Sequence, residues 1–298
     1  MKSPLRWLGA KTKVLASLDP FIPHDFTTYV EPFLGGASVL LHVKQTRPKV
    51  NNFHVNDVYP ALFNFWDQMQ SNSVHVFQKI DQLWDIYKAG GMASQVRPDG
   101  TIDYDADGRG RRLYNFCKDV VSRSDIPKDH YDMWAACFYI LNRITFSGAT
   151  EAGSFSAESY AKRLTDTTYA KLKEVPPILT DNVKITNTDF SEVLNQTPDD
   201  AFVYLDPPYS NAKKLYGPSG KLHDSFNMDG HERLVSHLKQ AKYRWLLTYD
   251  DSPLIRELYG FANLNEVSVV YGAGNKNIQA SGKSMRKTEL YITNYEPR

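Results

Sequence analysis

The stretch Thr28–Ser38, TYVEPFLGGAS, decides the fold of this chain. It begins with residues typical of a buried strand, passes through a turn that contains Gly35 and Gly36, and leads into the apolar run Val39–Leu41. A strand, a tight glycine turn and a helix in this order form the first half of a βαβ unit. Glycines at such a turn let a ligand approach the backbone closely, because they have no Cβ.

The next segment extends this pattern toward a nucleotide-binding unit. The strand-like stretch Asn52–Asp57 ends in an acid, and Ala61–Met69 then looks helical. Asp57 follows Gly36 by 57 − 36 = 21 residues, near the offset of about 20 at which an acid meets ribose hydroxyls. The spacing favours a nucleoside ligand but does not distinguish NAD from S-adenosylmethionine, and the sequence G-x-G-x-x-G is absent.

The rest of the chain divides into a helical part and a second group of strands. Residues 71–174 show helical periodicity around a polar, glycine-rich stretch, and strand patterns return after Pro176. The expected later strands are Val183–Thr186, Phe202–Leu205, Trp245–Tyr249, Glu266–Tyr271 and Glu289–Thr293, the last two as a hairpin. We therefore predict an α/β fold with a parallel sheet built from residues 1–70 and 175–298, with a mainly helical domain, residues 71–174, inserted between them.

Composition excludes several classes of protein. The chain has 298 residues, 42% of them hydrophobic, and a formal net charge of +1. No apolar run approaches the roughly 20 residues that span a bilayer, and the N-terminus lacks the apolar segment of a signal peptide. We expect a cytoplasmic protein with no membrane contact.

No metal site is predicted either. Cys117 and Cys137 have no metal-ligand spacing and look like buried small hydrophobes in helices. The acids around Asp105–Gly108 resemble a calcium loop but lack its final glutamate. Gly9–Thr12 is not a phosphate loop, because Leu5 and Ala10 stand where that motif needs glycine.

The second informative stretch is Phe202–Tyr209, FVYLDPPY, a buried strand that ends in an acid, two prolines and an aromatic residue. The exocyclic amine of a base is a poor nucleophile, and acceptors for both of its N–H groups would activate it. Asp206, the carbonyl of Pro207 and the ring of Tyr209 could supply two acceptors and a stacking face, with Pro208 stiffening the turn. The simpler interpretation is a strand that ends in a proline turn.

These residues also carry a resemblance. Asp206–Tyr209 resembles the catalytic motif of the methyltransferases that make N6-methyladenine. Pro4–Lys11 (PLRWLGAK) and Glu31–Ser38 (EPFLGGAS) are similar to the cofactor motifs of Dam-type DNA adenine methyltransferases, and the order of the motifs matches. The resemblance implies a class I, Rossmann-like methyltransferase fold, S-adenosyl-L-methionine as cofactor, and a helical target-recognition domain. One departure is Ala37, which stands where a further glycine is usual.

The resemblance also assigns roles by position. Trp7 and Lys11 would contact the methionine end of the cofactor, Asp57 its ribose, and Asp189 with Phe190 its adenine. The other residues implied in the cofactor site are Phe33, Leu34, Gly35, Gly36, Ala37, Ser38, Val58 and Asp206.

The segment Leu141–Gly148, LNRITFSG, is similar to the part of Dam-type enzymes that reaches DNA. Arg143 would touch the DNA backbone or a base, and Phe146, followed by Ser147 in place of the usual asparagine, would enter the gap left by a flipped adenine. The alternative for Phe146 is a core aromatic. Residues 149–152 lack the arginine of GATC-recognising members, so the target sequence is not inherited.

The C-terminal segment carries a local basic excess. Lys276, Lys283 and Lys287 are expected to contact DNA phosphates, with a solvated tail as the alternative. The predicted function is methylation of adenine N6 in double-stranded DNA, in a prokaryotic or phage-infected cell. An RNA adenine or protein amide methyltransferase and a catalytically silent nucleic-acid-binding module are the alternatives. The sequence leaves open the oligomeric state and whether a restriction endonuclease is a partner.

Overall fold

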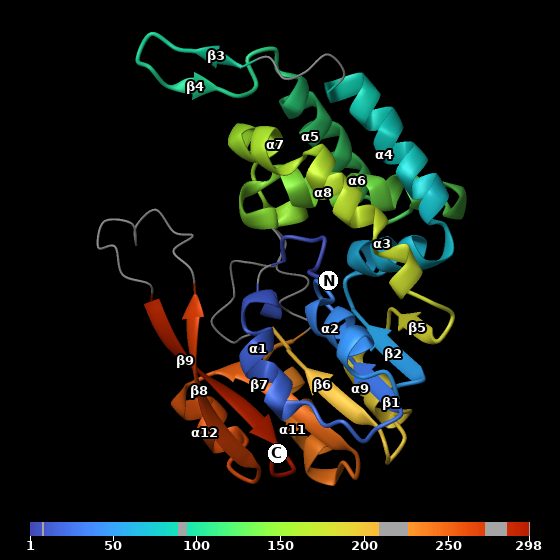
Figure 1. The fold of residues 1–298 in the computed structure, drawn as a ribbon, viewed down its shortest axis with the longest axis vertical. Helices are drawn as coiled ribbons and strands as arrows, with labels where there is room; N and C mark the ends of the chain where they lie inside the picture. The colour runs from blue at the N-terminus through green and yellow to red at the C-terminus, as the bar shows by residue number, and fades with distance from the viewer. Residues whose placement is uncertain (8, 89–93, 209–225, 272–284, 298) are drawn as a thin grey trace.

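A seven-stranded sheet forms the centre of the lower part of the molecule in Figure 1. The computed structural model describes residues 1–7, 9–88, 94–208, 226–271 and 285–297. The strands of the sheet are β1 (Thr28–Glu31), β2 (Asn52–Asn56), β5 (Val183–Thr186), β6 (Phe202–Leu205), β7 (Arg244–Asp250), β8 (Asn263–Tyr271) and β9 (Met285–Thr293). Each overlaps one of the stretches that the sequence predicts as strands.

The strand order is β5-β2-β1-β6-β7-β9-β8. The first five strands of this order are parallel, whereas β9 runs antiparallel to both β7 and β8. The predicted hairpin of the last two strands is therefore confirmed. The order reverses between β1 and β6, and in open α/β sheets a ligand binds beyond the carboxyl ends of the strands at this reversal.

Helices lie on both faces of the sheet and form a separate block above it (Figure 1). The helices that cover the sheet are α1 (Leu15–Leu18), α2 (Ser38–Thr46), α3 (Pro60–Ser71), α9 (Phe190–Asn195), α11 (Met228–Gln240) and α12 (Pro253–Leu258). The helical block contains α4 (Ser73–Lys88), α5 (Arg109–Val121), α6 (Tyr131–Ile144), α7 (Ala157–Arg163) and α8 (Asp166–Lys173). In the described part of the chain no helix is both long and apolar enough to cross a bilayer.

One element of the block was not expected from the sequence. The short strands β3 (Gln95–Val96) and β4 (Ile102–Asp103) form a small hairpin that projects from the top of the molecule in Figure 1. Its Val96 side chain is 73% exposed, so no buried face is available to produce an alternating pattern in the sequence. A strand of two residues is also too short for such a pattern.

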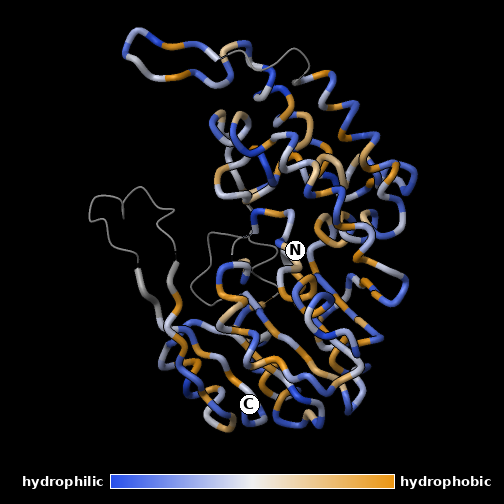
Figure 2. Tube along the Cα trace, in the orientation of Figure 1, coloured by the Kyte–Doolittle hydropathy of each residue, from blue (hydrophilic) through white to orange (hydrophobic). Residues whose placement is uncertain are grey.

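Alternate residues of the central strands face two different cores, because successive side chains of a strand point to opposite faces. Phe202 and Tyr204 pack in the core under α2 and α3, and Val203 and Leu205 pack in the core under α9, α11 and α12. Both faces are thus covered, as in parallel sheets generally. Figure 2 shows the hydrophobic segments gathered along these strands.

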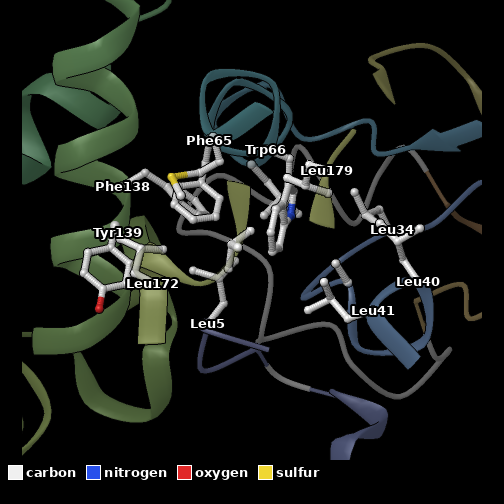
Figure 3. Packing of buried hydrophobic residues seen from close by; sticks show 14 of the residues in the cluster. Leu5, Leu34, Leu40, Leu41, Phe65, Trp66, Phe138, Tyr139, Leu172 and Leu179 are labelled. Carbon is white, nitrogen blue, oxygen red and sulfur yellow. The ribbon is translucent and has the colours of Figure 1, made fainter. Parts of the chain in front are cut away.

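The first of these cores continues from the sheet into the helical block. Phe65 of α3 lies 5.6 Å from Phe138 of α6, measured between ring centroids, and Figure 3 shows these rings in one cluster with Leu40 and Leu41 of α2. Every residue from Ala135 to Ile144 of α6 is buried. The boundaries at residues 70 and 174 stay a prediction, since the block and the sheet share this core.

Candidate active site

A pocket opens at the carboxyl ends of β1, β6 and their neighbours in the sheet. The strand order reverses between β1 and β6. The space within the pocket is about 710 Å³ when its open side is included. Its described lining residues are Trp7, Pro32, Phe33, Gly35, Asn56, Asp57, Val58, Tyr59, Asp189, Phe190, Asp206, Pro208 and Phe226. The glycine turn after β1 and the acid after β6 therefore share one cavity.

The glycine turn is shaped by the N-terminal segment that packs on it. A Cβ on Gly35 would lie 2.7 Å from Nε1 of Trp7, and a Cβ on Gly36 would lie 2.8 Å from Cβ of Trp7. Gly35 also has a φ of +49°, which glycine adopts at no steric cost. These glycines are thus required by the close approach of Trp7, a reason that the sequence pattern did not reveal.

Asp57 fastens this turn to the end of β2. Its carboxylate accepts hydrogen bonds from the backbone N–H of Gly35, at 2.8 Å, and from that of Tyr59, at 3.0 Å. Burial raises the pKa of Asp57 to about 6, although these two hydrogen bonds act in the opposite direction. The carboxylate sits at the pocket wall, and each of its oxygens has a second lone pair that a ribose hydroxyl could use.

Three aromatic rings close one end of the pocket. The rings of Phe33, Phe190 and Phe226 lie 5.4 to 5.6 Å apart, centroid to centroid. Beside them Asp189 accepts a pair of hydrogen bonds from Arg233, at 2.9 and 3.1 Å. Burial tends to raise the pKa of Asp189, but the hydrogen bonds from Arg233 and Ser191 outweigh it and lower the pKa. An apolar, aromatic wall with a charged group beside it suits an adenine ring.

Asp206 also lines the pocket, directly after β6, and two donors hold one of its oxygens. The ammonium of Lys11 is 2.8 Å from its Oδ1, and the hydroxyl of Thr248 donates to the same oxygen at 2.9 Å. Burial by itself lowers the pKa of Lys11, but the charge of Asp206 and the hydrogen bond to it raise the pKa above its usual value. Lys11 is therefore a permanent cation that holds one carboxylate oxygen of Asp206.

The structure brings most of the predicted cofactor residues to this pocket. Of them, Trp7, Phe33, Gly35, Asp57, Val58, Asp189, Phe190 and Asp206 line it, whereas Lys11, Leu34, Gly36, Ala37 and Ser38 are not among its described lining residues. Lys11 instead reaches Asp206, and the Ser38 hydroxyl bonds that of Thr12. The roles of all these residues stay predictions.

Sequence reasoning missed several residues of the wall. Asn56 ties three strand ends together, since its amide donates to the carbonyls of Pro32 and Thr188 and accepts from the Thr188 N–H. Its place directly before Asp57 was a usable signal, because a polar residue that ends a buried strand needs partners. Phe226 carried no such signal, because the sequence before it shows no strand or helix pattern that would place it at the pocket.

The candidate DNA-contacting residues of the helical block fall in different environments. Arg143 is only 7% exposed, and its guanidinium donates to the carbonyls of Arg163 and Pro4. This position does not support the predicted DNA contact of Arg143, because the side chain is used to join the N-terminal segment to the block. Asn142 makes a similar link, bonding the backbone N–H and carbonyl of Arg6.

Phe146 is 66% exposed, so it is not the core aromatic that was the alternative. Ser147 beside it has a φ of 55°, in the left-handed region that asparagine and glycine tolerate best. This explains why asparagine is usual there in the resembling family.

The structure does not test the contacts with adenine or DNA that are predicted for Tyr209, Lys276, Lys283 and Lys287. Tyr209, Lys276 and Lys283 lie outside the described residues. Lys287 belongs to the backbone of β9, paired with Val269 of β8.

The strand order, with its single antiparallel strand β9, and the pocket at the reversal together define a Rossmann-like α/β methyltransferase. Residues 7–273 match the family model described as D12 class N6 adenine-specific DNA methyltransferase. The chain belongs to this family and is a DNA adenine-N6 methyltransferase.

Known methyltransferases are similar in sequence to this chain over nearly its whole length. The Type II methyltransferase M.CviBI of Paramecium bursaria Chlorella virus NC1A is 27% identical, over 99% of this chain and 100% of that protein. The Type II methyltransferase M1.LlaDCHI of Lactococcus lactis subsp. cremoris is 23% identical, over 97% of this chain and 94% of that protein. Among solved structures, a precorrin-6y C5,15-methyltransferase from Geobacter metallireducens GS-15 covers 94% of this chain, and this chain covers 86% of it, at 9% identity with a TM-score of 0.37, too low to carry an argument.

Proposed function

We propose that this enzyme takes its methyl group from S-adenosyl-L-methionine and transfers it to an adenine that has rotated out of double-stranded DNA. The observation that carries the proposal is one cavity lined by both the Gly35 turn and Asp206. The aromatic end at Phe33 and Phe190 fits the adenine of the cofactor, and Asp57 fits its ribose. S-adenosyl-L-methionine, when bound, supplies a methyl group on a positively charged sulfur.

The turn after β6 would activate the target amine. Asp206 accepts one N6–H and the Pro207 carbonyl accepts the other, which directs the nitrogen lone pair toward the methyl group. The amine nitrogen would form its new N–C bond as the C–S bond of the donor breaks, and one N6 proton would leave to solvent water. Tyr209 is expected to stack on the adenine. Because the N6 atom cannot be reached inside a duplex, the base must flip out, at a cost of a few kcal/mol.

The exposed Phe146 and the lysines Lys276, Lys283 and Lys287 are the proposed contacts to DNA. A protruding ring can occupy the gap that the flipped base leaves, and lysines can bind phosphates. Since the relatives are named Type II methyltransferases, we place the enzyme as the modification partner of a restriction endonuclease. Methylation-sensitive sequencing of DNA from cells that express the chain would identify its target.

We expect Asp206→Ala to abolish methyl transfer and to leave cofactor affinity largely intact, because Asp206 acts on the amine. Tritium transfer and calorimetry on one preparation measure both quantities. Asp206→Asn accompanies it, since Ala leaves the buried Lys11 ammonium without this acceptor, whereas Asn keeps a side-chain oxygen that can accept from Lys11. Asp200→Ala is the control, at an exposed acid just before β6. More than about a tenth of the wild-type rate in Asp206→Ala would refute the assignment.

A further inference from the structure

The turn Pro207–Pro208 has no backbone N–H of its own, so it is held through its carbonyls. The carbonyl of Pro208 accepts a hydrogen bond from the hydroxyl of Tyr249, at 3.2 Å. Tyr249 lies in β7, the strand that pairs with β6, and its side chain is fully buried. The sheet thus holds the far end of the catalytic turn by one hydroxyl group.

The hydroxyl of Tyr249 is itself oriented by a histidine. Nδ1 of His231, in α11, lies 2.9 Å from the Tyr249 oxygen, and His231 is 2% exposed. A phenol has one proton to donate, and a carbonyl can only accept. With this proton given to the Pro208 carbonyl, the oxygen of Tyr249 is left to accept from a proton on Nδ1 of His231, and this is the tautomer that we assign.

His231 also contacts the wall of the cofactor pocket. Its ring packs edge to face on Phe226, with centroids 4.7 Å apart, and Phe226 lines the pocket with Phe33. Neither His231 nor Tyr249 is among the described residues that line the pocket. The pair therefore lies behind the site, in contact with both the cofactor wall and the catalytic turn.

We propose that His231 and Tyr249 form a positioning pair that sets the direction of the acceptors at Asp206 and Pro207. The proline rings fix φ at two successive residues, so a hydrogen bond at the Pro208 carbonyl removes much of the remaining rotation of the turn. The Pro207 carbonyl then faces the amine before the base arrives. Such preorganisation lowers the barrier to the chemical step and leaves substrate affinity unchanged. The inference rests on the function proposed for Asp206 and Pro207.

Tyr249→Phe removes the hydroxyl and keeps the ring. We expect the single-turnover rate of methyl transfer to fall at least about tenfold, with the cofactor Kd and the KM for DNA changed by less than about twofold. Tyr259→Phe is the matched control, because Tyr259 is also fully buried, its ring lies 6.3 Å from that of Tyr249, and its hydroxyl has no hydrogen-bond partner in the described part of the chain. The control should keep the wild-type rate.

Variants of His231 separate positioning from packing. His231→Asn places an amide N–H near the Nδ1 position and should retain most of the rate, whereas His231→Leu should be as slow as Tyr249→Phe. The double variant His231→Leu/Tyr249→Phe should be no slower than either single variant, because the two residues act as one pair and either change already disables it. A lower Tm without this pattern would show a structural role only.

The results also separate this inference from the proposed function. An inactive Asp206→Asn with a fully active Tyr249→Phe overturns the positioning pair alone. Equal rates in Tyr249→Phe and Tyr259→Phe overturn it as well. An active Asp206→Ala, which has no side-chain acceptor, instead refutes the role of Asp206, and with it the pair.

Discussion

Asp57 combines two tasks in one carboxylate, and its raised pKa follows from them. The carboxylate accepts the N–H groups of Gly35 and Tyr59 and so shapes the glycine turn, and it faces the pocket where we place the ribose. A position that serves the turn must be partly buried, and burial raises the pKa of Asp57 to about 6, from an ordinary value of about 4. The charge is therefore present at neutral pH and lost in mild acid.

We expect cofactor affinity to be constant above pH 6 and to weaken by up to about tenfold per unit below it. The sign follows from the raised pKa, since the free protein takes up a proton on Asp57 below pH 6 and a hydroxyl donor binds the ionised form better. Calorimetric titration with S-adenosyl-L-methionine from pH 8 to pH 5 measures this.

The control for this titration is Asp57→Asn, which should bind more weakly at pH 8 and show no decline around pH 6. An identical decline in Asp57→Asn would mean that another group is responsible.

At the scale of elements, the glycine turn and the N-terminal segment form one unit. Gly35 meets the ring of Trp7, whereas Gly36 meets its Cβ. We therefore expect Trp7→Ala to relieve the steric part of Gly35→Ala, leaving the strain of positive φ, and to give no relief to Gly36→Ala, because alanine keeps the Cβ. Melting temperatures of the single and double variants measure this coupling.

A relief of equal size in both pairs of variants would contradict this explanation of the turn.

Ala37, with a φ of 55°, extends the same geometry. The left-handed conformation explains why glycine is usual at that position.

The sequence was sufficient for the strands and most of the pocket, for physical reasons. Buried strands such as Phe202–Leu205 leave a continuous apolar run, and an acid or glycine at their ends marks the edge where ligands bind. The environment of Arg143 could not be predicted from the sequence. A charged residue at the end of a helix looks the same in a sequence whether its side chain contacts DNA or two backbone carbonyls. His231 and Phe226 were missed since their contacts join distant segments.

At the scale of the whole molecule, the core shared by the sheet and the helical block determines cooperativity. Phe138 of α6 is fully buried, and its ring lies 5.9 Å from that of Tyr59 and 6.4 Å from that of Trp7. It thus contacts α3, the pocket wall and the N-terminal segment together. Arg143 and Asn142 add polar links at the same junction. A helical block fixed in this way would hold the DNA contact that we propose for Phe146 in register with the pocket.

We therefore expect the enzyme to unfold in one thermal transition, with equal calorimetric and van't Hoff enthalpies. Phe138→Ala should destabilise the protein by about 3 to 5 kcal/mol and shift the whole transition, because its cavity lies in the shared core. Phe116→Ala, at a residue of α5 that is 38% exposed, is the matched control and should shift it little. Hydrogen exchange followed by mass spectrometry should show β6 and α5 losing protection together in Phe138→Ala. Loss confined to the helical block would mean that the block is a separate folding unit and that the shared core does not couple it to the sheet.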